Sequence, residues 1–209
     1  MKLFTTHRPV GIATIAIAVT ALFTTTLGAA PADAVPRGTP VPSSALPPQV
    51  TTALEAAIDA TGTFDGRRAI SAGVTPSTAD DFATGWAAAG KPTRNATIDQ
   101  VAIAEVRDAL PSLRACSGKN RWDYTGIQLN VYLDSCNTTR VAGILGTAGG
   151  VTAAAAAITA VTGIGLAVAG TFAGLLAIAG GIVTICSARG KGVVIHNIPP
   201  GPAVWCNGQ

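Results

Sequence analysis

The chain has 209 residues, of which 48% are hydrophobic and only 12% are charged, with a formal net charge of +3 at pH 7. This small net charge provides no basic stripe for a polyanion, so a nucleic-acid partner is not expected. The charge is uneven, because residues 110–209 carry six basic side chains and only two acidic ones, Asp123 and Asp134. The length is sufficient for one domain, or two small ones, with a sizeable core.

The N-terminus has the parts of a secretory signal peptide. Lys2 and Arg8 form a basic region, an apolar run covers residues 10–23, and the small residue Ala34 precedes the expected cleavage point. Because the apolar run is short for a membrane anchor, we expect residues 1–34 to be removed and the protein to be secreted. An uncleaved N-terminal anchor is the alternative.

The next two segments are predicted to be a linker and a small helical segment. Residues 35–48 contain five prolines and few apolar groups, which favours a linker. In residues 49–115, apolar residues recur three times at the spacing of a helix. The predicted helices cover Val50–Ala60, a stretch opened by a capping box at Ser77 and Asp80 and closed by Gly90, and Thr97–Leu110 before Pro111.

The period of the pattern changes to that of a strand in residues 116–209. Apolar and polar residues alternate from Ile127 to Leu133, which predicts a strand with one buried face. Gly192–Ile198 and Ala203–Cys206 provide two more short strands. Together the elements predict an α+β fold that is mostly α, with a small disulfide-tied β-sheet at the base of a helical hairpin.

The predicted hairpin occupies residues 141–188, which lie between Arg140 and Arg189 and contain no charged side chain. This run of 48 residues is about twice the length that a helix needs to cross a bilayer, which is roughly 20 residues. Gly163 and Gly165 near its middle favour a turn, so we predict two helical arms of about 20 residues each.

Small side chains dominate this run, which contains 10 glycines and 14 alanines. Gly146 with Gly150, and Gly170 with Gly174, place pairs of glycines one helical turn apart. This GxxxG spacing is used for close helix contacts in lipid, where packing replaces the hydrophobic effect. We therefore expect these four glycines to form the packing surface between the arms.

A helix that is apolar on every side must be buried by lipid or by protein. Our first hypothesis is a secreted membrane-active protein, bacteriocin-like or toxin-like, that inserts or docks the hairpin in a lipid bilayer. Arg140, Arg189 and Lys191 flank the run and are placed to meet anionic headgroups. The alternative is a secreted structural or cell-envelope interaction protein, with the hairpin buried in its own core or by self-association in an oligomer.

Four cysteines lie in the second half of a chain that is expected to reach an oxidising compartment: Cys116, Cys136, Cys186 and Cys206. An even number there predicts two disulfides rather than metal ligands or a nucleophile. An antiparallel hairpin brings its two ends together, which slightly favours the nested pairs Cys136–Cys186 and Cys116–Cys206. The local pairs Cys116–Cys136 and Cys186–Cys206 fit the spacing almost as well.

The sequence contains no motif of a catalytic, nucleotide-binding or metal-binding site, so no enzyme activity, cofactor, metal or small-molecule substrate is expected. His196 is the one histidine that remains after cleavage, and it is interpreted as an ordinary sheet residue. The carboxylate pair Asp80-Asp81 is interpreted as a helix cap. Trp122, Tyr124 and Trp205 are expected to fill the small sheet rather than to form an interfacial belt.

The second half also carries a resemblance in four segments: RWDYTGIQL at 121–129, LDSC at 133–136, VIHNI at 194–198 and WCNGQ at 205–209. With the Ala/Gly-rich run between them, about the last 95 residues resemble small, uncharacterised secreted proteins of high-GC Gram-positive bacteria. This resemblance carries no activity over to the chain. The run alone also resembles, in composition, the insertion hairpin of pore-forming bacteriocins.

Overall fold

The fold was determined as a computed structural model, which describes residues 46–110, 116–147, 149–178, 186, 191–199 and 204–209. All of these residues belong to one unit, Val41–Gln209. The predicted signal peptide and most of the predicted linker lie outside the described residues. The class is mixed, with more helix than strand, as predicted.

The N-terminal part contains four helices and a two-stranded parallel sheet. The helices are α1 (Pro48–Ala56), α2 (Gly66–Ser71), α3 (Pro76–Ala88) and α4 (Gln100–Ala109), and β1 (Phe64–Asp65) pairs with β2 (Thr93–Arg94). The predicted capping box at Ser77 is wrong. The side chain of Thr75 caps α3 by accepting the N–H of Thr78 at 3.3 Å, because Pro76 suits the first helical position. The short elements α2, β1 and β2 were not predicted.

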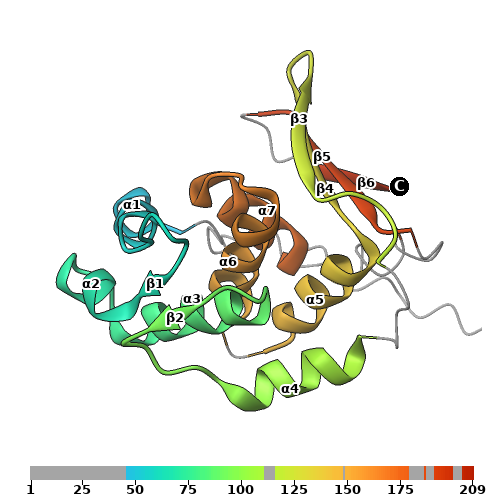
Figure 1. The fold of residues 1–209 in the computed structure, drawn as a ribbon. Coiled ribbons are helices and arrows are strands. Elements are labelled where there is room, and N and C mark those ends of the chain that lie inside the picture. Colours follow the sequence, from blue (N-terminus) through green and yellow to red (C-terminus); the bar gives the residue numbers. More distant parts are fainter. Residues whose placement is uncertain (1–45, 111–115, 148, 179–185, 187–190, 200–203) are drawn as a thin grey trace, which may run out of the picture. The chain divides into compact units, whose positions relative to one another are not determined.

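The C-terminal part contains a four-stranded antiparallel sheet and three helices (Figure 1). The strands are β3 (Arg121–Thr125), β4 (Gln128–Leu133), β5 (Val193–Asn197) and β6 (Val204–Gly208), and they are adjacent in this order. The helices, α5 (Ser135–Leu145), α6 (Gly150–Thr162) and α7 (Leu166–Ile178), lie between β4 and β5 in the sequence. The three predicted strands correspond to β4, β5 and β6 and are confirmed, although Ile127 lies in the turn before β4 and is exposed. Strand β3 was not predicted.

The most deeply buried helix is α6, which Figure 1 shows among the other helices. Its residues Ala153–Ala157 and Ile158 are at most 1% exposed, and α3, α5, α7 and β4 all lie against it. The closest contact joins α6 to α3 at Gly85, where an added Cβ atom would lie 1.9 Å from the carbonyl oxygen of Ala153. The alanine run therefore forms the centre of a helical core in which small residues allow close approach.

The first arm of the predicted hairpin is not one continuous helix. It is divided into α5, which ends at Leu145, and α6, which begins at Gly150. The predicted turn is present, since Gly163 ends α6 in the left-handed conformation with φ of 72°. The described part of α7 ends at Ile178, and the rest of the second arm lies almost entirely outside the described residues.

No helix among the described residues is long and apolar enough to cross a membrane.

The two faces of the four-stranded sheet differ in chemistry. Leu129, Val131 and Leu133 of β4, with Val193 and Ile195 of β5, point to the inner face and are at most 2% exposed. These side chains belong to the same hydrophobic core as α6, and β3 and β4 lie against that helix. Successive residues of a strand point to opposite sides, so the intervening residues form an outer face that is turned away from the core.

Two disulfides link Cys116 to Cys136 and Cys186 to Cys206, with Cα–Cα distances of 5.3 Å and 5.9 Å. Our preference for the nested pairs is therefore wrong, and the local alternative is confirmed. The error follows from the assumption that a long helical arm of the hairpin begins just after Cys136. Cys136 instead lies in the first turn of α5, where the N–H of its neighbour Ser135 donates to the carbonyl of Ser117 at 2.8 Å.

Candidate functional site

The outer face of the sheet carries a row of polar and aromatic side chains that crosses all four strands. The strand register places Asp123 of β3 opposite Asn130 of β4, Asn130 opposite His196 of β5, and His196 opposite Trp205 of β6. We call Asp123, Asn130, His196 and Trp205 the outer row. Because the inner face is anchored in the core, the strands hold these side chains in a fixed order.

Hydrogen bonds connect the first three members of the outer row. Asn130 Nδ2 donates to Asp123 Oδ1 at 2.7 Å, and Asn130 Oδ1 lies 2.7 Å from His196 Nδ1. Gln128 Nε2 donates to the same Asn130 oxygen at 2.6 Å. At the other end, the rings of His196 and Trp205 stack with centroids 5.2 Å apart. Asn130 is buried, so its amide is committed to this network.

The hydrogen bonds indicate a neutral His196 imidazole. Asn207 Nδ2 lies 3.2 Å from His196 Nε2, and Gln128 Nε2 lies 2.8 Å from His196 Nδ1. An amide nitrogen can only donate, so at least one ring nitrogen accepts, which requires the neutral form. Burial lowers the pKa of His196 below its ordinary value of 6.5, and the negative charge of Asp123 opposes this shift only in part. The imidazole is therefore positioned as a neutral polar surface group.

The chemistry of the outer row suits recognition better than catalysis. Its side chains are a carboxylate, amides, a neutral imidazole and an indole, and the contacts of His196 within the row are to amides and to a ring. Trp205 is 37% exposed, so one aromatic ring remains accessible at the end of an ordered polar network. Exposed aromatic rings beside amide donors and acceptors are typical of binding sites.

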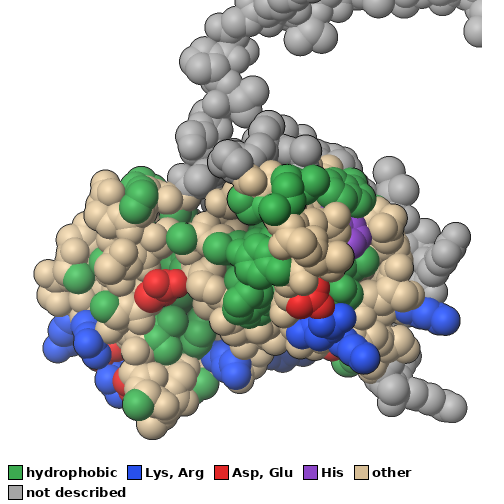
Figure 2. Space-filling view, turned by 90° about the horizontal axis from the view of Figure 1, so that it is seen from above, with side chains coloured by type: hydrophobic (Ala, Val, Ile, Leu, Met, Phe, Trp, Pro, Cys, Tyr) green, Lys and Arg blue, Asp and Glu red, His purple; other side chains and the backbone are tan. Residues whose placement is uncertain are grey.

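The expectation that three aromatic side chains fill the sheet is wrong. Trp122, Tyr124 and Trp205 are 43%, 58% and 37% exposed. Trp122 and Tyr124 form an edge-to-face pair at 6.0 Å, and the exposed Ile127 and Ile198 lie toward the same end of the sheet. We call Trp122, Tyr124, Ile127 and Ile198 the apolar tip. Figure 2 shows hydrophobic side chains gathered on the face that is seen from above.

A recess of about 400 Å³ adjoins the apolar tip, between the sheet and α7. Its walls include Tyr124, Val168, Phe172 and the buried amide of Asn197. Mostly apolar walls with a single amide suit a small apolar group better than a charged one.

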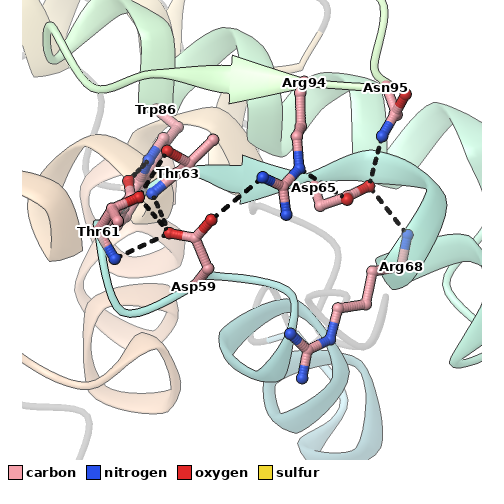
Figure 3. A network of polar contacts seen from close by, with 9 residues as sticks. Asp59, Thr61, Thr63, Asp65, Arg68, Trp86, Arg94 and Asn95 are labelled. Carbon is pink, nitrogen blue, oxygen red and sulfur yellow. Dashed lines mark hydrogen bonds and ion pairs between the residues drawn. The ribbon is translucent and has the colours of Figure 1, made fainter.

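A second polar network lies in the N-terminal part, around Arg94 (Figure 3). Arg94 Nε donates to Asp65 Oδ2 at 2.9 Å, and its Nη1 lies 3.3 Å from Asp59 Oδ2. Asp59 Oδ1 accepts the backbone N–H groups of Thr61 and Thr63 at 2.9 Å and 3.0 Å. The guanidinium occupies the space between the two carboxylates, so this network joins β1 to β2 and is not a metal site.

Replacing Asp65 with asparagine is expected to lower the melting temperature at neutral pH, but not at pH 2. The hydrogen bond from Arg94, followed by that from Asn95, lowers the pKa of Asp65 from 3.8 to about 2. The charged carboxylate therefore stabilises the fold above about pH 4, and this contribution is lost as the pH falls from 3.8 towards 2. Melting curves from pH 7 to pH 2 test this, with Asp108→Asn on α4 as the control. A difference between Asp65→Asn and wild type that stays constant with pH would contradict the assignment.

Three of the four predicted packing glycines do not make the close helix contacts expected of them. Gly146 caps α5 and Gly150 begins α6, so this pair spans a helix break. A Cβ atom on Gly170 would meet only the side chain of Leu46, at 3.8 Å or more. Gly174 is buried within α7. The closest glycine contact joins α3 to α6 instead, and Gly85 on α3 is a residue that the sequence analysis missed.

The structure places both predicted turn glycines near the α6–α7 turn, and it places two of the three predicted flanking cations in different surroundings. Gly163 ends α6, and Gly165 accepts the N–H of Ala169 at 3.0 Å in the first turn of α7. Arg140 lies on α5, half-buried, where burial lowers its pKa and its guanidinium donates to Asn137. Lys191 is exposed just before β5, and Arg189 lies outside the described residues.

One group of side chains among the described residues has the spacing of a metal site: Cys116, Asp134 and Cys136. Both cysteines are joined in a disulfide, so their sulfur atoms are not available as thiolate ligands. Asp134 caps α5 by accepting the N–H of Asn137 at 2.7 Å. This group is therefore structural.

Comparison of the chain with protein-family models, with curated proteins and with solved structures gave no match. The outer row was missed by the sequence analysis, which used the alternating pattern only to locate the buried face. The outer face could have been predicted from the polar residues of that pattern, which are Gln128, Asn130 and Tyr132.

Proposed function

We propose that the protein is a secreted cell-envelope interaction protein, which binds its ligand on the outer face of the sheet and acts without catalysis. The observation that carries this proposal is the outer row, a continuous network across four strands that ends in the exposed ring of Trp205. The two disulfides are consistent with an extracellular protein. They lie in the part of the chain that contains the sheet.

The burial of α6 favours the alternative hypothesis from the sequence. Insertion of the predicted hairpin in a bilayer requires α6 to leave α3, α5 and α7, although its residues Ala153–Ala157 are at most 1% exposed among them. In this position the middle of the helix, residues 153–158, offers no free surface to lipid. The Ala/Gly-rich segment is therefore better explained as the core of a binding protein, which was the alternative hypothesis.

A second candidate function is docking on a membrane surface through the apolar tip. Trp122, Tyr124, Ile127 and Ile198 are all exposed, and aromatic rings are favoured at the boundary between lipid and water. This mode differs from the bacteriocin-like or toxin-like insertion that we first expected, because it leaves the helical core intact.

Replacing Trp205 with alanine is expected to weaken binding to bacterial cell walls by at least about tenfold, since exposed tryptophans in binding sites commonly contribute more than about 1.4 kcal/mol. The measurement is co-sedimentation of the oxidised secreted protein with insoluble cell walls and, separately, with lipid vesicles. Trp122→Ala is the matched control, because Trp122 lies on the apolar tip and not on the outer row.

The two functions give different results in this assay. Wall binding that needs Trp205 but not Trp122 supports the proposed function. Vesicle binding that needs Trp122 but not Trp205 supports docking through the apolar tip. Both functions are contradicted if the protein sediments with neither material. They are also contradicted if the Trp205→Ala and Trp122→Ala variants sediment as well as wild type.

A further inference from the structure

A separate pocket opens on the sheet at the end opposite to the β3–β4 turn. Its volume is about 520 Å³, which is within the range of about 300–1,000 Å³ that is typical of small-molecule sites. Lys119, Arg121 and Lys191 line it, together with Tyr132 and Gln209. Arg121 and Tyr132 face each other across β3 and β4 on the outer face, so the pocket continues the surface that carries the outer row.

The pocket has an excess of positive charge. Three cationic side chains line it, and none of the lining residues is acidic. Arg121 forms an ion pair with Asp123, whereas no ion pair found among the described residues involves Lys119 or Lys191. The nearby Asp134 is committed to capping α5 and to the amide of Asn120. The pocket lining therefore carries two lysine charges that no ion pair among the described residues engages.

The backbone that carries the two lysines is tightly held. The side chain of Gln209 accepts the N–H of Lys119 at 2.8 Å and donates to the carbonyls of Leu133 and Val193 at 2.8 Å and 3.1 Å. Gly118 has φ of 102°, and a Cβ atom there would lie 2.3 Å from the carbonyl oxygen of Lys191. This close approach, which only glycine allows, brings the segments of Lys119 and Lys191 together.

Arg121 is held in an orientation that suits an oxyanion. Its guanidinium carbon lies 4.0 Å above the centre of the Tyr132 ring, so stacking restricts the plane of the guanidinium group. Nη1 of this group already donates to Asp123, and the remaining N–H donors lie in the same restricted plane, where they suit the oxygen atoms of a phosphate group. The two lysines add mobile point charges on the same side of the sheet.

We propose that this pocket, which we name the anion pocket, binds a phosphate ester carried by the ligand of the outer face. A phosphate monoester has a charge of about −1.5 to −2 at pH 7, which balances the excess charge of the pocket. The volume is sufficient for the organic group of the ester as well as the phosphate. This inference rests on the proposed function, because it names the chemical class that the outer face recognises.

The test is a titration of the oxidised secreted protein with glycerol phosphate, followed by amide chemical shifts, with glycerol as the uncharged control. The double variant Lys119→Gln/Lys191→Gln is expected to bind at least about tenfold more weakly, because charge-assisted hydrogen bonds to the phosphate are lost. Arg67→Gln/Lys91→Gln is the matched control, since it removes two exposed positive charges outside the pocket. Saturable shifts at residues 117–121 that persist in this control support the proposal. Equal weakening in both double variants, or no saturable binding to wild type, overturns it.

A second arm uses the cell-wall assay and vesicles of phosphatidylglycerol. If wall binding needs Trp205 and the protein does not bind glycerol phosphate, the assignment of phosphate binding to the anion pocket is wrong and the proposed function stands. If glycerol phosphate binds in the pocket and no wall binding occurs, the pocket is right and the proposed function is wrong. Vesicle binding that is lost in Lys119→Gln/Lys191→Gln assigns the phosphate ester to a lipid headgroup, and soluble binding alone assigns it to another ester.

Discussion

The variant Gly85→Ala is expected to be less stable than wild type by about 3 kcal/mol, the upper part of the range for overpacked cores. An alanine in a helix interior normally stabilises a protein by up to about 1 kcal/mol relative to glycine. At Gly85 the sign is reversed, because the new methyl group would lie 1.9 Å from the carbonyl oxygen of Ala153 and 2.6 Å from its Cα atom. Backbone atoms cannot rotate away, so α3 and α6 must separate.

Gly170→Ala is the matched control for this prediction. It is also a glycine-to-alanine change within a helix, but its Cβ atom would only touch the side chain of Leu46 at 3.8 Å. We expect it to be neutral or to stabilise by up to about 1 kcal/mol. Denaturant unfolding followed by tryptophan fluorescence compares the two variants. A stable Gly85→Ala together with a strongly destabilised Gly170→Ala would contradict the α3–α6 contact and would favour the predicted packing of the hairpin.

Strands β4 and β5 could be predicted from the sequence because one local property determines them. From Ile127 to Leu133 the apolar residues alternate with polar ones, and this period of two fixes both the strand and its buried face. The same holds for β5, where a short apolar segment lies between glycine and proline residues. No knowledge of the partners was needed.

The arrangement of the helices could not be predicted in the same way. A run without charges has the same composition whether lipid or protein surrounds it. The sequence of residues 141–188 therefore did not distinguish a membrane hairpin from a protein core. The decisive residue, Gly85, lies 68 positions before its contact Ala153, in a helix whose own pattern gives no sign of the contact. The break between Leu145 and Gly150 is likewise set by packing against other helices.

The candidate site depends on the register of strands that are distant in sequence. His196 looked like an isolated histidine, since its partners Asn130 and Gln128 lie more than 60 residues before it. Lys119 and Lys191 are separated by more than 70 residues and approach each other only through the backbone contact at Gly118. Sequence composition predicted a mildly cationic second half, and the fold concentrates part of that charge in one pocket.

Removing either disulfide is expected to lower the free energy of unfolding by about 3 kcal/mol. Both bridges have the same sequence separation, 20 residues, so the entropy that each removes from the unfolded chain is nearly equal. Cys116→Ser/Cys136→Ser and Cys186→Ser/Cys206→Ser should therefore unfold at similar denaturant concentrations, both well below that of wild type. The fully reduced protein is the reference for the loss of both bridges. A variant as stable as wild type would contradict the corresponding bridge.

Trypsin can establish the pairing directly, because each cysteine falls in its own tryptic peptide. Cleavage after Lys and Arg separates the peptides 115–119, 122–140, 141–189 and 192–209. The local pairing predicts that 115–119 remains joined to 122–140, and 141–189 to 192–209, in mass spectra of the unreduced digest. A link between 122–140 and 141–189 would restore the nested pairing. It would also leave the segment of Cys116, whose neighbour Ser117 lines the anion pocket, without its covalent link to α5.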